Sequence, residues 1–255
     1  MPELILEKLS TFTLSESALA DRVLLITGAT GGYGSAIAKA ATQAGASVII
    51  LGRNLTKLET LYDDLVAIGN HPPTLITLDQ SQAPEQDYFE LANTIHAEFG
   101  QLDGVVHASA DLGVLTPLES LDQTVWNQVM AVNLHSARLI AAACLPLLRQ
   151  SPLGSMVFTL DQKHSAYWGA YGVSKAALHN LSVMLADENE GKKDSNGNPL
   201  VAINAINPGP MRTALRRKAF PGEMESETRL ASTRVGPMMY LLSRQDRSVT
   251  GAILS

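Results

Sequence analysis

The chain has 255 residues, is 45% hydrophobic but only 5% aromatic, and carries a formal net charge of −6, a balance that argues against nucleic acid as a partner. Its single cysteine, Cys144, excludes an internal disulfide and a cysteine metal cluster. No apolar run reaches the roughly 18 residues needed to span a bilayer, and the N-terminus lacks a basic leader, so we expect a cytoplasmic protein with no membrane partner. The weakly amphipathic residues 1–20 are expected to form an arm on a single domain, 21–255.

Short runs of branched apolar residues alternate with helix-forming segments along the rest of the chain. Such runs are typical of strands that are buried on both faces in a parallel sheet. The expected strands cover 23–26, 47–51, 75–78, 103–107, 154–159, 200–206 and 251–254. The expected helices cover 35–41, a segment to 68 capped by Asn54, 84–99, 123–149 and 168–190. This alternation predicts an α/β fold: a Rossmann-type doubly wound parallel sheet of about seven strands with helices on both faces. The polar, breaker-rich segment 190–199 is predicted to be a solvated surface loop.

The first expected strand runs directly into a glycine-rich turn, Thr27-Gly-Ala-Thr-Gly-Gly-Tyr-Gly34, and then into a helix. A strand, a glycine turn and a helix in this order point free backbone N–H groups and the positive end of the helix at a phosphate. Gly28 would make the tight turn, Gly32 would let the backbone approach a pyrophosphate, and Gly34 would let the helix pack close to the strand. The stretch therefore predicts a dinucleotide site.

The residue after the second strand indicates which dinucleotide is preferred. Sites selective for NAD(H) place an acidic residue there to accept the ribose 2′-OH, whereas this chain has Gly52 followed by Arg53. A guanidinium binds a 2′-phosphate through two N–H groups, and a carboxylate would repel it. We expect NADP(H) to be the preferred cofactor, with NAD(H) as the alternative.

Tyr171 and Lys175 lie four residues apart and therefore share one face of the expected helix 168–190. A free tyrosine has a pKa near ~10, which is too high for a base at neutral pH. A lysine ammonium held nearby favours the phenolate and lowers that pKa. The pair is expected to donate and accept a proton beside a carbonyl or an alcohol.

Taken in chain order, these motifs resemble the short-chain dehydrogenase/reductase family over about residues 21–251. The matching pieces are the glycine turn, Asp79 after the third strand, Asn133 in Val129-Met-Ala-Val-Asn-Leu134, the pair Tyr171 and Lys175, and Asn207-Pro-Gly-Pro-Met-Arg-Thr213. Within the family, the segments 168–175 and 206–213 look closest to the bacterial YciK-like oxidoreductases.

The resemblance implies hydride transfer between a nicotinamide and a secondary alcohol, a ketone or an aldehyde, with Tyr171 as the acid or base. Lys175 would lower the Tyr171 pKa and hold the nicotinamide ribose, and Asn133 would support a relay water by bending its helix. Asp79 would bind the adenine amino group or only cap a turn. Pro208 and Gly209 would line the nicotinamide pocket, and Thr213 would reach the carboxamide or the phosphates. The implied cofactor-binding residues are Gly28, Thr30, Gly32, Tyr33, Gly34, Arg53, Asp79, Ser109, Tyr171, Lys175, Pro208, Gly209 and Thr213.

Two departures from the family pattern bear on activity. After the fourth strand, Ala108-Ser109-Ala110 replaces Asn-Ala-Gly, and the neighbouring His107 is expected to end a buried strand rather than to bind a metal with Asp111. Before Tyr171, the family's substrate-orienting serine position falls on the strand residue Phe158. If the loop after the fifth strand is short, Asp161 takes the place of this serine. The charged form of Asp161 would raise the Tyr171 pKa, whereas its protonated form would donate a hydrogen bond. Thr159 or Ser165 are the alternatives.

These departures also favour a second hypothesis, a dinucleotide-binding sensor or scaffold of the same fold with weak or no catalysis. The segment 211–232 is expected to form a mobile flap over a small-molecule substrate. Its basic residues either attract an acidic substrate or face solvent; they are Arg212, Arg216, Arg217 and Lys218. The resemblance further implies a homodimer or homotetramer formed through the helices 123–149 and 168–190.

Overall fold

In the computed structural model, which describes residues 9 and 11–255, the centre of the protein is a seven-stranded parallel sheet with the strand order β3-β2-β1-β4-β5-β6-β9. The strands are β1 (Val23–Thr27), β2 (Ser47–Gly52), β3 (Thr74–Thr77), β4 (Gly104–His107), β5 (Gly154–Thr159), β6 (Val201–Ile206) and β9 (Ile253–Leu254). The predicted α/β fold and its parallel sheet are confirmed. The strand order reverses between β1 and β4, and a doubly wound sheet binds its ligands at such a point, outside the carboxyl ends of the strands.

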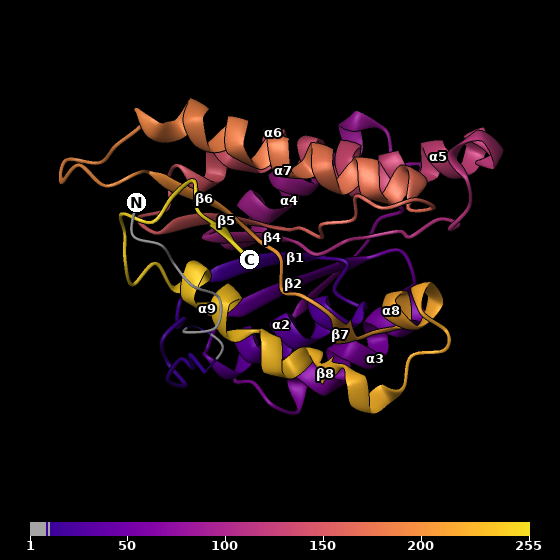
Figure 1. Ribbon diagram of the computed structural model, residues 1–255. Coiled ribbons are helices and arrows are strands. Elements are labelled where there is room, and N and C mark those ends of the chain that lie inside the picture. The colour runs from indigo at the N-terminus through magenta and orange to yellow at the C-terminus, as the bar shows by residue number, and fades with distance from the viewer. Residues whose placement is uncertain (1–8, 10) are drawn as a thin grey trace.

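Helices cover both faces of this sheet, with α4, α6 and α7 above it and α2, α3 and α9 below it in the view of Figure 1. The helices are α2 (Gly32–Gln43), α3 (Leu55–Val66), α4 (Glu85–Phe99), α5 (Gln123–Met130), α6 (Ser136–Leu148), α7 (Gly169–Glu190), α8 (Ala214–Ala219) and α9 (Gly236–Ser243). The predicted cap of α3 is confirmed, because the Asn54 side chain accepts a hydrogen bond from the backbone N–H of Lys57.

The expected continuous helix 123–149 is interrupted. A π-helical turn, Ala131–His135, separates α5 from α6. By length and hydropathy alone the stretch Gln123–Leu148 could cross a membrane, but 56% of its apolar window is buried inside the fold. A core helix under a sheet meets the same criterion, so the stretch is weak evidence for a membrane span.

Helix α9 was not predicted from the sequence. Its side chains Met238, Met239, Leu241 and Leu242 are all buried against the sheet. A helix that is apolar on nearly all sides lacks the one-sided periodicity by which sequence patterns reveal helices.

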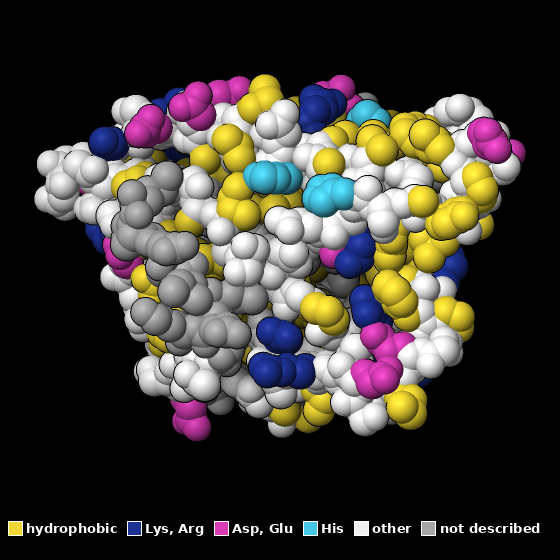
Figure 2. Space-filling view, viewed as in Figure 1, with side chains coloured by type: hydrophobic (Ala, Val, Ile, Leu, Met, Phe, Trp, Pro, Cys, Tyr) yellow, Lys and Arg dark blue, Asp and Glu magenta, His cyan; other side chains and the backbone are white. Residues whose placement is uncertain are grey.

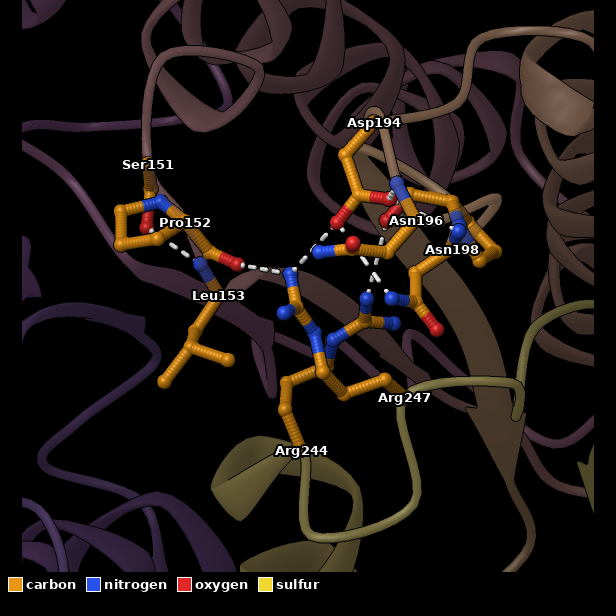
Figure 3. A network of polar contacts seen from close by, with 9 residues as sticks. Ser151, Pro152, Leu153, Asp194, Asn196, Asn198, Arg244 and Arg247 are labelled. Carbon is orange, nitrogen blue, oxygen red and sulfur yellow. Dashed lines mark hydrogen bonds and ion pairs between the residues drawn. The ribbon is translucent and has the colours of Figure 1, made fainter.

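In the loop 190–199, Asp194 is tied to residues at the amino end of the sheet (Figure 3). Asp194 accepts hydrogen bonds from the backbone N–H groups of Asn196 and Asn198 at 2.9 Å and pairs with Arg247 at 3.1 Å. Arg247 also donates to the carbonyl of Pro152 at 2.7 Å. The segment is a largely exposed surface loop, as predicted, and the Asp194 charge organises it.

Two peripheral segments pack on this core. In the segment expected to be an arm, residues 1–8 and 10 lie outside the described residues, while Leu19 is fully buried and the Phe12 ring packs edge-on against Tyr240. In the segment expected to be a flap, β7 (Met211–Arg212) pairs with β8 (Arg229–Leu230), and α8 lies between these strands in the sequence.

Candidate active site

A cleft of about 570 Å³ opens at the carboxyl ends of the strands, between the glycine turn and α8. It brings together most of the predicted site residues: Gly28, Thr30, Gly32, Tyr33, Arg53, Asp79, Ser109, Asp161, Tyr171, Lys175, Pro208, Gly209 and Thr213. Gly34 and Asn133 are buried behind its wall. The Tyr33 side chain is also buried, and its hydroxyl donates to the carbonyl of Arg234 at 3.2 Å, so this phenol faces the core.

The glycine turn is built by close contacts that leave no room for a side chain. Gly28 has a φ of +60°, and a Cβ there would lie 2.6 Å from Ser109 Cα. A Cβ on Gly34 would collide with the carbonyl oxygen of Gly28 at the start of α2. The turn is thus held against the loop after β4, with its backbone facing the cleft.

The exposed Arg53 and Lys57 follow β2 and line the cleft together with Asp79. The Asp79 carboxylate caps a turn, accepting from the backbone N–H of Ser81 at 3.0 Å and from its hydroxyl at 2.7 Å. These hydrogen bonds, aided by the nearby charge of Arg53, lower the pKa of Asp79. The turn-capping alternative for Asp79 is therefore observed.

Gln80 is a member of the site that the sequence reasoning missed. This buried side chain accepts a short hydrogen bond from the hydroxyl of Ser109 and donates to the hydroxyl of Ser136 at 3.0 Å. It thereby fixes the loop after β4 beneath the cleft. The sequence feature that could have identified Gln80 is its position directly after Asp79, at the carboxyl end of a strand.

The Tyr171 phenol is hydrogen bonded to a carboxylate. The Tyr171 hydroxyl donates to Asp161 Oδ2 at 3.0 Å, and Asp161 Oδ1 pairs with the Lys163 ammonium at 3.1 Å. Burial, and after it the charge and the hydrogen bond of Asp161, raises the pKa of Tyr171 above its ordinary value. The net shift is upward, in the direction expected for a charged Asp161, and the lowering expected from Lys175 does not outweigh it.

Lys175 is buried beside Tyr171, on the same face of α7, as the four-residue spacing predicted. Its ammonium donates to the carbonyl of Thr159 at 2.8 Å and lies 6.0 Å from the centre of the Tyr171 ring. Burial lowers the pKa of Lys175 to about 8, against an opposing effect of Asp161. The side chain is therefore still mostly a cation at neutral pH.

His107 ends β4 inside the core, as expected. Its ring stacks on Phe158 of β5 with 4.4 Å between the ring centres. Burial first, and the charge of Lys175 second, lowers the pKa of His107 to about 3. The imidazole is therefore neutral in the folded protein.

Asn133 lies in the π-helical turn and supports the cleft from behind. Its Oδ1 accepts from the backbone N–H of Asp111 at 2.7 Å, and its Nδ2 donates to the carbonyl of Asp111 at 2.9 Å and to the hydroxyl of Ser174 at 2.9 Å. The side chain thus connects the loop after β4 to α7.

The candidates for the missing serine are placed differently. Thr159 lines the cleft, but its hydroxyl is buried without a hydrogen bond among the described residues, and Ser165 is exposed outside the cleft lining. Thr213 caps α8 by accepting from the backbone N–H of Arg216 at 3.1 Å, and a Cβ on Gly32 would lie 2.7 Å from its methyl group. Of the candidates Asp161, Thr159 and Ser165, Asp161 is the one hydrogen bonded to Tyr171 among the described residues.

The wall opposite Tyr171 is formed by α8 and is basic. Arg216 makes a bidentate ion pair with Glu223, at 2.8 and 2.6 Å, and lies flat on Phe220. Lys218 donates to the carbonyl of Gly113 at 2.8 Å and so connects α8 to the loop after β4.

Comparison with known proteins identifies the family. The model of the short chain dehydrogenase family matches residues 22–224. The chain belongs to the short-chain dehydrogenase family. It is 34% identical over 239 residues to the uncharacterised oxidoreductase YciK of Escherichia coli K12, covering 92% of each chain.

Solved structures of the same family agree with this fold. A chain from Pseudomonas syringae assigned to the short-chain dehydrogenases has a TM-score of 0.90 at 37% identity, covering 95% of this chain and 97% of that chain. Another, from Escherichia coli CFT073 and complexed with NADPH, has a TM-score of 0.88 at 34% identity, covering 94% and 98%. The resemblance inferred from the motifs, including the likeness to YciK, is confirmed, and the protein is a member of a family of oxidoreductases.

Proposed function

We propose that the protein is an NADP(H)-dependent oxidoreductase that interconverts a secondary alcohol and a ketone, or an aldehyde and its alcohol. One observation carries this proposal: a single cleft joins the glycine turn at one end to Tyr171 and Lys175 near the other. The NADPH complex of the E. coli CFT073 relative, whose fold this chain shares at a TM-score of 0.88, supports the cofactor assignment.

The residues present fit a phosphorylated dinucleotide. The backbone of Gly28 and Gly32 would hold the pyrophosphate, because a cradle without Cβ atoms lets a ligand approach free N–H groups. Arg53 and Lys57 would hold the 2′-phosphate, and Lys175 the nicotinamide ribose. When bound, the nicotinamide supplies the hydride.

The chain's own residues move the proton. Tyr171 would give its phenolic proton to the carbonyl oxygen during reduction and take it back during oxidation. The Lys175 cation would stabilise the phenolate left behind. Asp161 would occupy the place of the substrate-orienting serine, and Asn133 would fix the helix bend beside them.

A panel of ketones and aldehydes, incubated with NADPH while its absorbance is followed, tests the proposal. We expect carbonyl-dependent oxidation of NADPH that Tyr171→Phe abolishes without weakening NADPH binding. Tyr167→Phe, which alters an exposed tyrosine outside the cleft lining, is the matched control and should leave the rate unchanged. Binding of NADPH without oxidation by any carbonyl compound would instead identify the sensor or scaffold.

The preference for NADP(H) has its own test. Replacing Arg53 with Ala should weaken NADPH binding roughly tenfold or more, because a charge-assisted contact to the 2′-phosphate is lost. NADH lacks this phosphate, so its dissociation constant should not change. Tighter binding of NADH than of NADPH to the unaltered protein would contradict the preference.

We further propose that the protein works in the cytoplasm as a homodimer or homotetramer associated through α5, α6 and α7. The exposed apolar side chains of α7 support this: Val173, Val183 and Met184 are each more than 40% exposed.

A further inference from the structure

The cleft is basic although the chain as a whole is acidic. Six Lys and Arg side chains and three Asp side chains line it, whereas the formal net charge of the chain is −6. In Figure 2, dark blue side chains border the hollow beside α8. A cleft that concentrates one sign of charge attracts ligands of the opposite sign.

The basic side chains form two separate groups. Arg53 and Lys57 follow β2, at the end proposed for the 2′-phosphate, while Lys163 follows β5 and Arg216 and Lys218 belong to α8. Three strand spacings separate β2 from β5, which amounts to roughly 14 Å. That distance separates Lys163 from the 2′-phosphate. Arg216 feels the charge of Asp161, and Lys218 contacts Gly113 in the loop after β4, so the second group stands at the Tyr171 end of the cleft.

Lys163 is held beside the reacting phenol. The Asp161 carboxylate bridges the two groups, with one oxygen 3.0 Å from the Tyr171 hydroxyl and the other 3.1 Å from the Lys163 ammonium. The ammonium also lies 5.1 Å over the ring of Trp168. The Lys163 side chain is 22% exposed, so a molecule in the cleft can reach it.

The α8 wall supplies two more cations. The pairing of Arg216 with Glu223 uses its Nε and Nη2 atoms, and no described residue is hydrogen bonded to Nη1. The Lys218 ammonium is fixed at the cleft edge by its contact with Gly113. Asp111, Asp161 and Glu223 offset part of the charge at this end, and the Lys175 cation keeps the total positive.

We infer that Lys163, Arg216 and Lys218 form an anion subsite and that the substrate is a carbonyl compound bearing a carboxylate or phosphate group. The inference rests on the proposed function, because it takes Tyr171 as the point where the carbonyl oxygen binds. The anionic group would accept charge-assisted hydrogen bonds from Lys163 and from the Nη1 edge of Arg216 while the carbonyl faces Tyr171. Lys218 would add attraction as the substrate enters.

Matched pairs of substrates test the subsite. The pairs are 4-formylbenzoate with its methyl ester, for a carboxylate, and glyceraldehyde 3-phosphate with glyceraldehyde, for a phosphate. With saturating NADPH we expect kcat/KM to favour at least one anionic member roughly tenfold, and Lys163→Gln to remove most of that preference, measured as the ratio of the anionic to the neutral partner so that any effect common to both cancels. Lys218→Gln should reduce the preference less.

Arg217→Gln is the matched control, because Arg217 neighbours Lys218 on α8 but is exposed and is not part of the cleft lining. It should leave the preference unaltered. A second readout does not need turnover: in a Trp126→Phe background, Trp168 is the only tryptophan left, and it contacts Lys163. Its fluorescence should report the binding of each aldehyde to the NADP⁺ complex.

The two readouts separate the two claims. Anion-selective binding that is lost in Lys163→Gln supports the subsite even if no compound is reduced, in which case only the proposed function fails. Equal kcat/KM and equal binding for the anionic and neutral partners, or a preference that Lys163→Gln leaves intact, would overturn the subsite while leaving the reductase standing. Absence of binding by all four compounds overturns it as well.

Discussion

Tyr171 donates its hydrogen bond to a carboxylate, and this contact governs how readily the phenol ionises. In the proposed alcohol oxidation the phenolate would be the base, so kcat/KM should rise with pH through the pKa of Tyr171. The anionic Asp161 disfavours a second negative charge 3.0 Å away. The pH profile is therefore sensitive to a charge that the family's serine would not bring.

Replacing Asp161 with Asn keeps the shape and an acceptor for the phenol but removes the charge. The pKa of Tyr171 should fall, so the profile of kcat/KM for alcohol oxidation should move to lower pH by about one unit or more. The measurement is the initial rate with NADP⁺ across the pH range. Asp187→Asn removes a charge from an exposed site on α7 and should not move the profile. An unmoved profile for Asp161→Asn would remove Asp161 from the mechanism.

Stability in acid should depend on His107. Burial lowers its pKa to about 3 in the folded protein, whereas the unfolded chain takes up the proton near ~6.5. The stabilising contribution is thus present above pH ~6.5 and is lost as the pH falls toward 3. At pH 5 the free energy of unfolding should have dropped by about 2 kcal/mol from this residue alone.

Urea unfolding at pH 7 and pH 5 measures this loss. His107→Phe keeps an aromatic ring against Phe158 and removes the titrating group, so its unfolding free energy should change less between the two pH values. His71→Phe, at an exposed loop position, should behave like the unaltered protein. Equal losses in all three proteins would show that His107 is not the residue responsible.

The contacts of a single residue could be predicted where its spacing along a helix determines them. Its pKa could not be predicted, because that depends on how deeply the side chain is buried. The four-residue spacing placed Tyr171 and Lys175 together, and the sequence offered the effect of Asp161 as one of two alternatives, but it could not show that burial is the larger cause of the raised Tyr171 pKa. Lys163 was missed because its role depends on the path of the loop after β5, which brings it to Asp161. Gln80 was missed because its two hydroxyl partners come from distant elements.

At the scale of elements, the turn between β1 and α2 is held by backbone approach. A methyl group on Gly34 would collide with the carbonyl oxygen of Gly28 and lie 3.0 Å from Ala29 Cα, so Gly34→Ala must push α2 away from the strand. We expect a loss of about 1–3 kcal/mol in unfolding free energy and weaker NADPH binding, because the same backbone is proposed to hold the phosphates.

Urea unfolding and a NADPH titration measure the two effects. Gly191→Ala, at a position where an added methyl group has no neighbour within 4 Å and φ is negative, is the control and should be close to neutral. If Gly34→Ala lost stability but bound NADPH unchanged, the turn would be structural only.

Elements were predictable where apolar residues are continuous or one-sided. The buried runs of the sheet strands revealed their type and their order along the chain. The π-helical turn at Ala131–His135 leaves no mark on apolar periodicity, since only one backbone hydrogen-bond pattern changes. The short strands β7 and β8 also leave no recognisable sequence pattern, because two residues are too few to show the alternation of apolar and polar side chains.

At the scale of the molecule, strand order explains why distant segments meet in one cleft. The crossover from β3 to β4 puts the glycine turn beside the loop after β4, and β5 next to β4 brings in Asp161 and Tyr171. The sequence located these segments at the ends of strands, and the rule for doubly wound sheets placed them together. The sequence could not predict that the cleft carries a positive charge, because this charge depends on where α8 lies in the fold.

The outer face of α7 should bury itself against a second copy of the chain. Val173, Val183 and Met184 are 45%, 43% and 55% exposed on this helix, and yellow side chains are visible over α7 in Figure 2. A lysine placed in the centre of such a contact would have to lose its hydration without a partner, which costs several kcal/mol. Met184→Lys should therefore shift the protein from an oligomer toward the monomer.

Light scattering coupled to gel filtration measures the mass directly. Met224→Lys makes the same change at a 65% exposed position outside α7 and should leave the oligomer intact. Because Met184 is largely exposed in the single chain, its replacement should not lower the unfolding free energy of an isolated subunit, and circular dichroism should show an unchanged fold. A mass that is the same for Met184→Lys as for the unaltered oligomer would exclude this face of α7 as the interface, and a monomeric unaltered protein would exclude the association itself.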